Sequence, residues 1–258
     1  MNRISACLIT FNEEHNLRRV LSSVRGVADE IVVVDCGSKD RTQEIARENG
    51  AKIVTHAWTN FAEQKNIAGA AASHDWILSL DADEELSPEL RQALLEWKER
   101  EPEFAVYEFT RRTWYLGAWV WHTRWYPDYQ RKLYRRDKTR FEVPEHATVK
   151  YDGPVGRLEG DLLHYTLRSV DEHAAKVESI TTRQAQYLHA EGRRSWRAAM
   201  YLAAPWNWFN NYVLCLGFLD GRRGWIISQM AARGTWLKFK KLGKLIEAER
   251  SGGGMKSQ

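Results

Sequence analysis

Two aspartates separated by a single residue end an apolar run in the stretch "WILSLDADEE", residues 76–85. Asp81 and Asp83 flank Ala82, so on an extended chain their side chains point the same way. Carboxylate oxygens are preferred ligands of Mg²⁺ and Mn²⁺. A D-x-D pair is a weak signal by itself in a chain with 34 acidic residues, but its position at the end of a buried strand predicts a divalent cation site.

Polar residues also follow two earlier apolar runs, "ISACLIT" and "EIVVVD". They are Thr10, Asn12 and Glu13 at the first run and Asp35 and Ser38 at the second. Ligands of doubly wound sheets bind beyond the carboxyl ends of the strands, so these residues indicate a nucleotide site. Helix caps and turn residues are the alternative interpretation. The sequence lacks G-x-G-x-x-G after the first strand, which disfavours a dinucleotide site, and it lacks the P-loop motif.

The elements that must position these residues alternate between strand and helix patterns over the first hundred residues. Strands are predicted at 4–10, 30–35, 51–57 and 76–80, with helices at 17–24, within 37–50, at 62–72 and at 87–100. This βαβα order predicts a parallel, doubly wound sheet. Ser87 and Pro88 are predicted as the N-cap and first residue of the last helix, whose dipole would favour the preceding Glu84 and Glu85.

The regular alternation of strand and helix patterns ends after Phe104, where strands and an aromatic loop are expected. Residues 169–194 have the period of an amphipathic helix. We therefore predict a catalytic domain over 1–195, a basic and Trp-rich helical extension over 196–250, and a disordered tail over 251–258.

Composition excludes several classes of protein. The 258 residues carry a net charge of +4, which is too mild to indicate a nucleic-acid partner. Three cysteines without a C-x-x-C pair fit a reducing cytosol better than a zinc site or a disulfide framework. The N-terminal apolar run is too short for a signal peptide, so we expect a cytoplasmic protein.

Four stretches carry a family resemblance: "CLITFNEEHNL", "EIVVVDCGSKDRT", "AEQKNIAGAAASHDWILSLDADEEL" and "YQRKLYRR". They resemble the family 2 glycosyltransferases, and most closely the bacterial branch that builds the lipopolysaccharide core, the WaaE/KdtX-like glucosyltransferases. The resemblance covers roughly residues 3–245. It implies an α/β GT-A fold, which is a Rossmann-like, mainly parallel sheet flanked by helices, followed by a helical C-terminal extension.

The resemblance also implies an activity. It implies that a hexose, with glucose favoured, moves with inversion from a UDP-sugar to a lipid-linked saccharide acceptor, an inner-core heptose of lipopolysaccharide, with Mg²⁺ or Mn²⁺ as cofactor. A polyprenyl phosphate or another glycan acceptor is an alternative. A non-catalytic, membrane-surface saccharide-binding module is the alternative from another class. A nucleotidyltransferase would need a Gly-rich, basic first loop, whereas "TFNEEHN" is acidic.

Site residues follow from the same resemblance. It implies a nucleotide-sugar site formed by Thr10, Asn12, Glu13, Asp35, Ser38, Lys65, Asp81 and Arg131. Asp35 would hydrogen-bond the base, and Lys65 would approach the base or the phosphates. Lys65 as a solvated helix residue and Arg131 as part of an exposed strand face are the alternatives.

The metal site and the general base are less fixed. Asp83, Asp81 and a distant histidine, His164, are the expected metal ligands, although a lone histidine is more often a core residue. The family places a short HE-like motif after the "RLFRR"-like strand, whereas this chain has "FEVPEHATV". We favour Glu145 as the general base, because the usual base of the family is a carboxylate. His146 is the alternative, since its ordinary pKa suits proton transfer near neutrality.

An aromatic loop is expected on the acceptor side. Its members are Trp119, Trp121, Trp125 and Tyr126, interleaved with polar residues. Aromatic faces stack on sugar rings, although core packing is possible for any one of them.

The segment from Arg193 to Arg250 has eleven Lys or Arg residues against three acidic ones. Pro205 and several asparagines interrupt its apolar run, so a spanning helix is disfavoured. Aromatic and basic residues together predict a peripheral element on an anionic leaflet, at the cytoplasmic face of the bacterial inner membrane. A helical subdomain or an oligomer contact is the alternative.

Overall fold

The structure is a computed structural model that describes residues 1–142 and 148–253, and the chain divides into two compact units. The first unit comprises Met1–Arg112 and Asp128–Tyr165. The second comprises Thr113–Pro127 and Thr166–Gln258. The aromatic loop therefore groups with the C-terminal helices.

The N-terminal half of the first unit is built from alternating strands and helices. The strands are β1 (Ile4–Thr10), β2 (Glu30–Asp35), β3 (Lys52–Thr55) and β4 (Trp76–Asp81). The helices are α1 (Leu17–Val24), α2 (Thr42–Glu48), α3 (Phe61–Ala71) and α4 (Pro88–Lys98). The four strands pair in parallel in the order β3-β2-β1-β4.

Antiparallel strands complete the sheet. They are β5 (Glu84–Leu86), β6 (Val106–Tyr115), β8 (Asp128–Arg135) and β11 (Val155–Leu167), with β7 (Ala118–Trp119) paired to β6. The full order is β3-β2-β1-β4-β8-β6-β11-β5. A separate hairpin joins β9 (Arg140–Glu142) to β10 (Thr148–Lys150). The predicted α/β class, a Rossmann-like sheet flanked by helices with a helical C-terminal extension, is confirmed.

The sheet is covered on both faces because its central strands are apolar on both faces. Ile4, Ala6 and Leu8 of β1 pack with α1, α2 and α4, whereas Cys7 and Ile9 pack with α3. This alternation follows the two-residue period of a strand. Each fully buried aliphatic side chain contributes roughly 1.5–3 kcal/mol, so β1 alone anchors both layers.

Helix α4 begins as its sequence predicts. The Ser87 hydroxyl accepts a hydrogen bond from the Leu90 amide at 3.2 Å, and Pro88 is the first helical residue. The same hydroxyl accepts from the amide of Asp161 in β11, also at 3.2 Å. The cap therefore fixes the helix start and ties it to the far side of the sheet.

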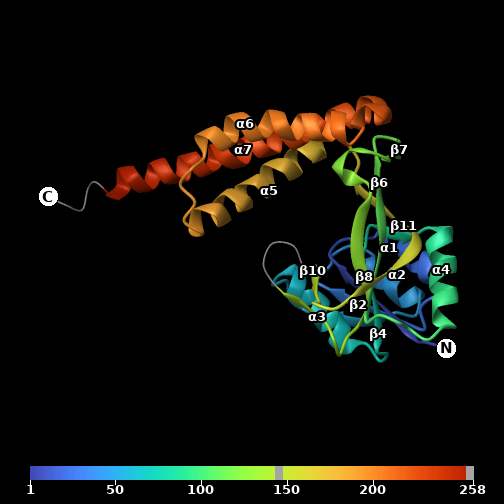
Figure 1. Ribbon diagram of the computed structural model, residues 1–258. Coiled ribbons are helices and arrows are strands. Elements are labelled where there is room, and N and C mark those ends of the chain that lie inside the picture. The colour runs from blue at the N-terminus through green and yellow to red at the C-terminus, as the bar shows by residue number, and fades with distance from the viewer. Residues whose placement is uncertain (143–147, 254–258) are drawn as a thin grey trace. The chain divides into compact units, whose positions relative to one another are not determined.

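The second unit is mainly helical. Its helices are α5 (Val170–Ala190), α6 (Arg197–Phe209) and α7 (Gly221–Gly253), with short turns η1 (Thr123–Trp125), η2 (Asn210–Leu214) and η3 (Gly217–Asp220). Helix α7 packs along both α5 and α6 (Figure 1). Their shared core contains Ala185, Met200, Phe239, Leu242 and Ile246.

Helix α7 continues to Gly253, which is three residues into the segment predicted as a tail. Helix α6 continues through Pro205, one of the residues that interrupt the apolar run of this segment. Within the described ranges, no helix combines the length and the apolar character needed to cross a membrane.

Candidate functional site

The loops that follow β1 and β2 are joined by hydrogen bonds at one edge of the sheet. The Asn12 amide donates to the Ser38 hydroxyl at 2.9 Å, and the Lys39 amide donates to the Asn12 side-chain oxygen at 2.8 Å. The Glu13 amide donates to the Thr42 hydroxyl at 2.8 Å. Asn12 has a φ of 55°, a left-handed conformation that asparagine tolerates better than most residues. These bonds join Asn12 and Glu13 of the first loop to Ser38, Lys39 and Thr42 of the second, and we call the polar structure that they form the polar ledge.

Asp35 is buried beneath the polar ledge and connects its residues by accepting hydrogen bonds. Its buried carboxylate accepts hydrogen bonds from the hydroxyls of Thr10 and Ser38 at 3.2 and 2.5 Å and from the Gln43 amide at 2.7 Å. The backbone amides of Gly37 and Ser38 donate to it as well, each at 3.0 Å. Burial opposes ionisation, but the bonds from Ser38 and Gln43 outweigh it and hold the pKa of Asp35 below its usual range. A nucleotide base could bond this carboxylate only by replacing one of these donors.

Glu13 lies at the start of α1. Its carbonyl accepts from the amides of Asn16 and Leu17 at 3.0 and 2.9 Å, and its carboxylate accepts from the Asn16 side chain at 2.8 Å. The predicted nucleotide residues of both strand ends thus belong to one hydrogen-bonded network, in which Thr10 and Asp35 are buried.

Asp81 ends β4 between two lysines from different elements. One carboxylate oxygen pairs with the Lys65 ammonium of α3 at 2.8 Å, and the other pairs with the Lys132 ammonium of β8 at 3.0 Å. Burial disfavours the charged carboxylate, but the charges of Lys132 and Lys65 outweigh it and hold the pKa of Asp81 well below its usual range. Lys65 and Asp81, which were each predicted for the nucleotide-sugar site, are therefore in direct contact.

Lys132 was not identified from the sequence. Tyr107 pairs with Leu133 and Glu108 with Arg131, so Lys132 is an extra residue in β8 at this bulge. Bulges bend a strand and change the direction of a side chain, often next to a functional site. The Lys132 ammonium is nearly buried, and the carboxylates of Asp81 and Glu84 raise its pKa although burial acts in the opposite direction.

Arg131, the residue predicted from this strand, is exposed, and its guanidinium donates to the Tyr151 carbonyl at 3.3 Å. The ammonium that reaches Asp81 belongs to its neighbour, Lys132. Lys132 is followed by the apolar Leu133 and by Tyr134 within the strand, and a lysine that is buried beside such residues needs an acidic partner. This was the available signal.

Glu84 is a member of the same charge network, which corrects the interpretation that it merely precedes a helix. It lies in β5, is fully buried, and accepts from the Asp81 amide at 2.9 Å and from the Lys132 ammonium at 2.7 Å. Arg111 lies 3.5 Å from its other oxygen and pairs with Asp128 at 2.7 Å. The network contains three carboxylates and three cations, namely Asp81, Glu84 and Asp128 with Lys65, Lys132 and Arg111. Their formal charges cancel.

Asp83 has a different environment from Asp81. The extended chain expected through the D-x-D ends at Asp81, and Ala82 and Asp83 form a turn before β5. The Asp83 carboxylate lies 3.3 Å from Nε2 of His164, and the Asp83 carbonyl accepts from the Tyr165 amide at 3.0 Å. The pairing of β5 with β11 therefore brings Asp83 to His164, as the resemblance implied.

The donor atoms of Asp83 and His164 fit a small divalent cation. Two neighbouring ligands of an octahedral ion with bonds of about 2.1 Å lie about 3 Å apart, close to the separation seen here. Nδ1 of His164 is buried and has no hydrogen-bond partner within the described residues. Among all the residues that the structure describes, no three His, Cys, Asp or Glu side chains form a group suited to a metal ion. Phosphate oxygens and water would therefore complete the ligand set, which is the usual arrangement for Mg²⁺.

Glu145 and His146 lie outside the described residues. The strands on either side of them are well anchored. The Asn66 side chain exchanges two 2.9 Å hydrogen bonds with the backbone of Phe141 in β9. The Phe141 ring centroid is 5.5 Å from the Lys65 ammonium. Strand β9, which ends at Glu142, therefore lies against α3 with Phe141 beside Lys65.

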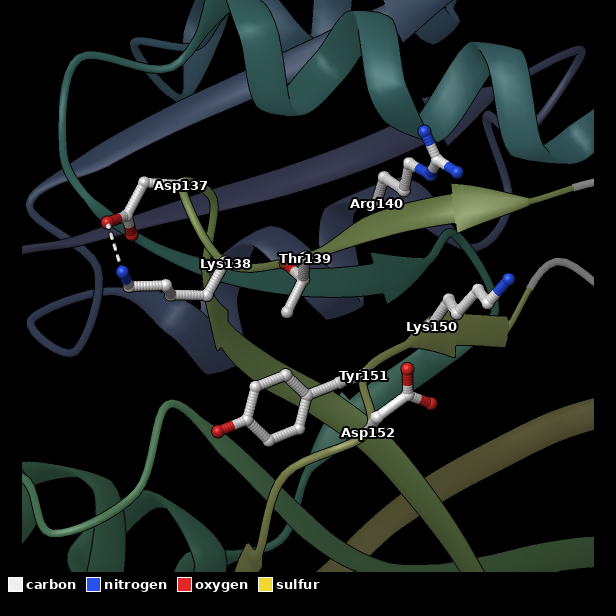
Figure 2. Close-up of a pocket in the computed structure, with 7 residues that line it drawn as sticks. All are labelled: Asp137, Lys138, Thr139, Arg140, Lys150, Tyr151 and Asp152. Carbon is white, nitrogen blue, oxygen red and sulfur yellow. Dashed lines mark ion pairs between the residues drawn. The ribbon is translucent and has the colours of Figure 1, made fainter.

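A hollow of about 330 Å³ in the first unit, separate from the residues described above, is lined by Asp137, Lys138, Thr139, Arg140, Lys150, Tyr151 and Asp152. Figure 2 shows that the cationic ends of Lys138, Arg140 and Lys150 point in different directions, with Lys138 toward Asp137. Arg140 and Lys150 both pair with Glu142. These cations do not converge on a common point, so the hollow is not a phosphate cradle.

The four aromatic residues predicted on the acceptor side belong to the second unit. Trp121 is about half exposed, at 49%, and lies 5.7 Å from the Tyr126 ring. Asp220 accepts from the amides of Trp121 and His122 at 3.2 and 2.8 Å, which pins the loop to η3. Trp119 packs edge-on against Trp114 at 5.0 Å.

Trp125 packs into a buried cluster. Its ring lies 5.4 Å from Tyr115 and 5.3 Å from His173. Tyr115 Oη and His173 Nδ1 are 2.9 Å apart. Burial lowers the pKa of His173 to about 4, with a smaller contribution from Lys176, and burial raises the pKa of Tyr115 to about 12. Within the loop, Trp121 is thus the ring most open to a ligand.

The Rossmann-like sheet, the polar ledge and the D-x-D motif together define a glycosyltransferase of the GT-A fold. Residues 5–152, more than half of the chain, match the family model described as Glycosyl transferase family 2. The chain belongs to this family, which confirms the resemblance found in the sequence.

Two curated relatives and one solved structure are similar to the chain. An uncharacterized glycosyltransferase of Rickettsia felis is 28% identical over 260 residues, with 94% of this chain and 90% of that protein covered. The lipopolysaccharide core biosynthesis glycosyltransferase LpsC of Rhizobium meliloti is 29% identical over 199 residues, with 74% and 73% covered. Residues 1–349 of S. aureus TarS, in complex with UDP-GlcNAc, superpose with a TM-score of 0.49 at 16% identity, covering 97% of this chain and 92% of that one.

Proposed function

We propose that this glycosyltransferase moves a hexose, with glucose favoured, from a UDP-sugar to a lipid-linked saccharide, an inner-core heptose of lipopolysaccharide, with inversion at the anomeric carbon. The main support is the site itself, where two lysines converge on Asp81 and where Asp83, two residues further along the chain, contacts His164 of β11. Similarity to LpsC, a lipopolysaccharide core glycosyltransferase, supports the class of acceptor.

The D-x-D motif divides into two roles in this proposal. Asp81 orients the ammonium groups of Lys65 and Lys132, which would otherwise repel each other, toward the donor diphosphate and ribose. Asp83 and His164 would hold Mg²⁺ or Mn²⁺. The bound cation would neutralise charge that develops on the departing nucleoside diphosphate. Asp81 is not needed as a direct metal ligand, because both of its oxygens are already paired with lysines.

The polar ledge receives the nucleoside. Asn12 and Glu13 offer polar groups at its rim, while Thr10, Ser38 and Asp35 fix its shape through the hydrogen bonds described above. Direct bonding of the base to Asp35 would require one of its internal donors to move.

The acceptor hydroxyl oxygen attacks the anomeric carbon while the bond from this carbon to the diphosphate oxygen breaks. The nucleoside diphosphate leaves, and the proton of the hydroxyl passes to a general base. Glu145 is the proposed base and His146 the alternative. The anchoring of β9 to α3 beside Lys65 supports this proposal. A loss of transfer in Glu145→Gln with retained donor binding is expected, whereas near-full transfer would move the role to His146 or another carboxylate. The rings of Trp119, Trp121, Trp125 and Tyr126 are proposed to serve the acceptor side, with Trp121 the most accessible.

The second unit is proposed to hold the enzyme on the cytoplasmic, anionic face of the inner membrane as a peripheral protein. Helix α6 and the following turns expose large apolar side chains, and α7 supplies most of the neighbouring basic residues. Peripheral helices bind anionic leaflets through this combination of residues.

A donor panel tests the proposal. UDP-, GDP- and ADP-sugars are titrated by calorimetry with Mg²⁺, with Mn²⁺ and with chelator, and hydrolysis is followed in parallel. We expect cation-dependent binding of a UDP-hexose that Asp83→Asn weakens about tenfold or more, with the exposed Asp75→Asn as matched control. Absence of binding for every nucleotide sugar would favour the non-catalytic saccharide-binding module. Transfer to a polyprenyl phosphate in place of a heptose acceptor would favour the other acceptor class.

A further inference from the structure

Helices α6 and α7 enclose a groove of about 600 Å³ in the second unit. Its lining includes Tyr201, Pro205 and Trp208 from α6 and Ala232, Arg233 and Trp236 from α7. Most of this surface is aromatic or aliphatic carbon, and none of the described residues that line it is acidic. Apolar pockets with few polar groups are typical sites for apolar ligands.

Local features of the two helices keep the groove open. Ala204 and Ala232 leave room where larger side chains would fill the space between the helices. Nearby, the Asn207 amide donates to the Thr235 hydroxyl at 2.7 Å and to the Ala231 carbonyl at 3.3 Å. These hydrogen bonds fix the spacing of α6 and α7, so the groove does not depend on a ligand for its shape.

The groove adjoins a stripe of exposed apolar side chains on α6. Leu202, Trp206 and Phe209 follow one another at helical spacing and are 72%, 59% and 40% exposed. Tyr201, which lines the groove, is itself 67% exposed. An apolar surface of this kind on a folded unit marks an interaction site.

The charges around the groove are complementary to a phosphate headgroup. Arg233 lines the groove and is exposed. The Lys240 ammonium lies 4.3 Å from the Trp236 ring centroid, one turn further along α7. Helix α7 has eight Lys or Arg residues against two acidic ones between Gly221 and Gly253. An apolar ligand with an anionic end fits both the lining and its border.

We infer that the α6–α7 groove binds one acyl chain of an anionic phospholipid of the bilayer, with the lipid phosphate beside Arg233. This inference rests on the proposed membrane association and names the lipid that the second unit takes up. A saccharide would require several hydrogen-bonding partners, whereas the lining is mostly carbon. A second copy of the chain would bring another strongly basic α7 to the same face.

The direct test uses the full chain and dihexanoyl phosphatidylglycerol below its micelle concentration, with binding measured by calorimetry. We expect saturable binding that weakens about tenfold in Ala232→Phe, which fills the groove, and similarly in Arg233→Glu, which opposes the phosphate. Arg233→Glu is an exposed substitution, so it tests the site even if Ala232→Phe disturbs folding. The matched control Ala175→Phe changes an exposed alanine of α5 and should bind as the unaltered chain does.

The second arm uses vesicles of phosphatidylglycerol and phosphatidylcholine that contain an acyl-chain photoprobe. Cross-links are expected at Ala204 and Trp236, and Ala232→Phe should remove them while flotation with vesicles persists through the α6 stripe. Flotation without groove labelling and without binding of the short-chain lipid overturns the groove inference alone. Loss of flotation with retained short-chain binding rejects the membrane proposal and leaves the groove as a lipid site. Dimerisation that Ala232→Phe abolishes, with no lipid binding, overturns the inference in favour of a second copy.

Discussion

The two units depart from the usual distribution of polar and apolar side chains in opposite ways. In the first unit, Lys132 and Glu84 are buried charges, which folded proteins avoid unless the charges are paired. In the second unit, Leu202 and Trp206 are large apolar residues left in solvent. The charges of the first unit are balanced by one another within the network, whereas the apolar side chains of the second unit stay exposed to solvent and mark an interaction site.

The difference between the units has a practical consequence. Removing one member of a buried, paired network leaves an uncompensated charge and costs stability as well as function. Removing an exposed apolar side chain affects association but has little effect on stability. The two regions can therefore be separated experimentally by comparing activity, binding and unfolding in the same variants.

The largest effect is expected for Asp83→Asn. Its carboxylate faces His164, outside the buried lysine network, so the substitution removes a proposed metal ligand without leaving a lysine unpaired. Transfer should fall roughly a thousandfold, while the midpoint of thermal unfolding changes little. Glu85→Ala is the control, because Glu85 bonds the Tyr165 hydroxyl at 3.1 Å, and its effect should be mild. Equal losses in both variants would contradict the assignment of Asp83.

Lys132→Met should produce the largest loss of stability. It leaves Glu84 fully buried with Arg111 as its remaining nearby cation, and it removes one of the two partners of Asp81. The free energy of unfolding, measured with urea, should fall by about 3–5 kcal/mol. The exposed Lys138→Met in the same unit is the matched control and should change it by less than about 0.5 kcal/mol.

Charge balance provides a sharper form of this test. Adding Glu84→Gln to Lys132→Met removes the excess negative charge and should restore part of the lost stability, whereas donor binding should stay weak because an ammonium is still missing. If the double variant is no more stable than Lys132→Met, the network is not governed by charge neutrality.

Much of the first unit could be predicted because its local signals agree with its tertiary structure. The apolar runs of β1, β2 and β4, and the cap formed by Ser87, are local features of sequence. The resemblance assigned both Lys65 and Asp81 to the nucleotide-sugar site, but their ion pair was not predicted from the sequence. Family membership was carried by contiguous motifs, and the match over residues 5–152 confirms it.

The missed features depend on contacts between distant residues. The insertion of β8 beside β4, and the bulge that turns Lys132 toward Asp81, have no local signature. Glu84 was misinterpreted because a short strand before a helix resembles a helix entrance, and its pairing partner β11 lies about eighty residues later. The sequence showed that this segment is rich in aromatic and basic residues. Only the packing of α6 on α7 shows which face of α6 is exposed.

An intermediate effect is expected for the double variant Leu202→Ser and Trp206→Ser. Both side chains are mostly exposed, at 72% and 59%, so unfolding should be nearly unchanged. Loss of their burial in a lipid surface should reduce partitioning to anionic vesicles roughly a hundredfold in flotation assays. Tyr187→Ser, which removes an exposed aromatic residue from α5, is the matched control. Unchanged flotation of the double variant would show that the α6 stripe is not the membrane contact.

The smallest effect is a dependence of stability on pH that belongs to the second unit. The pKa of His173 is about 4 in the folded chain and about 6.5 in the unfolded chain, so the unfolded state binds more protons between these values. The stabilising contribution is complete above pH 6.5 and is lost as the pH falls toward 4, by roughly 2 kcal/mol at pH 4.5. His173→Gln should flatten this part of the stability profile, whereas replacing the exposed His15 of the first unit should not.

In the first unit, the lowered pKa of Asp81 gives a contribution that is lost only below about pH 4, so acid should destabilise the second unit first. A single transition with the same pH dependence in both units would contradict this order and would mean that the two units unfold together.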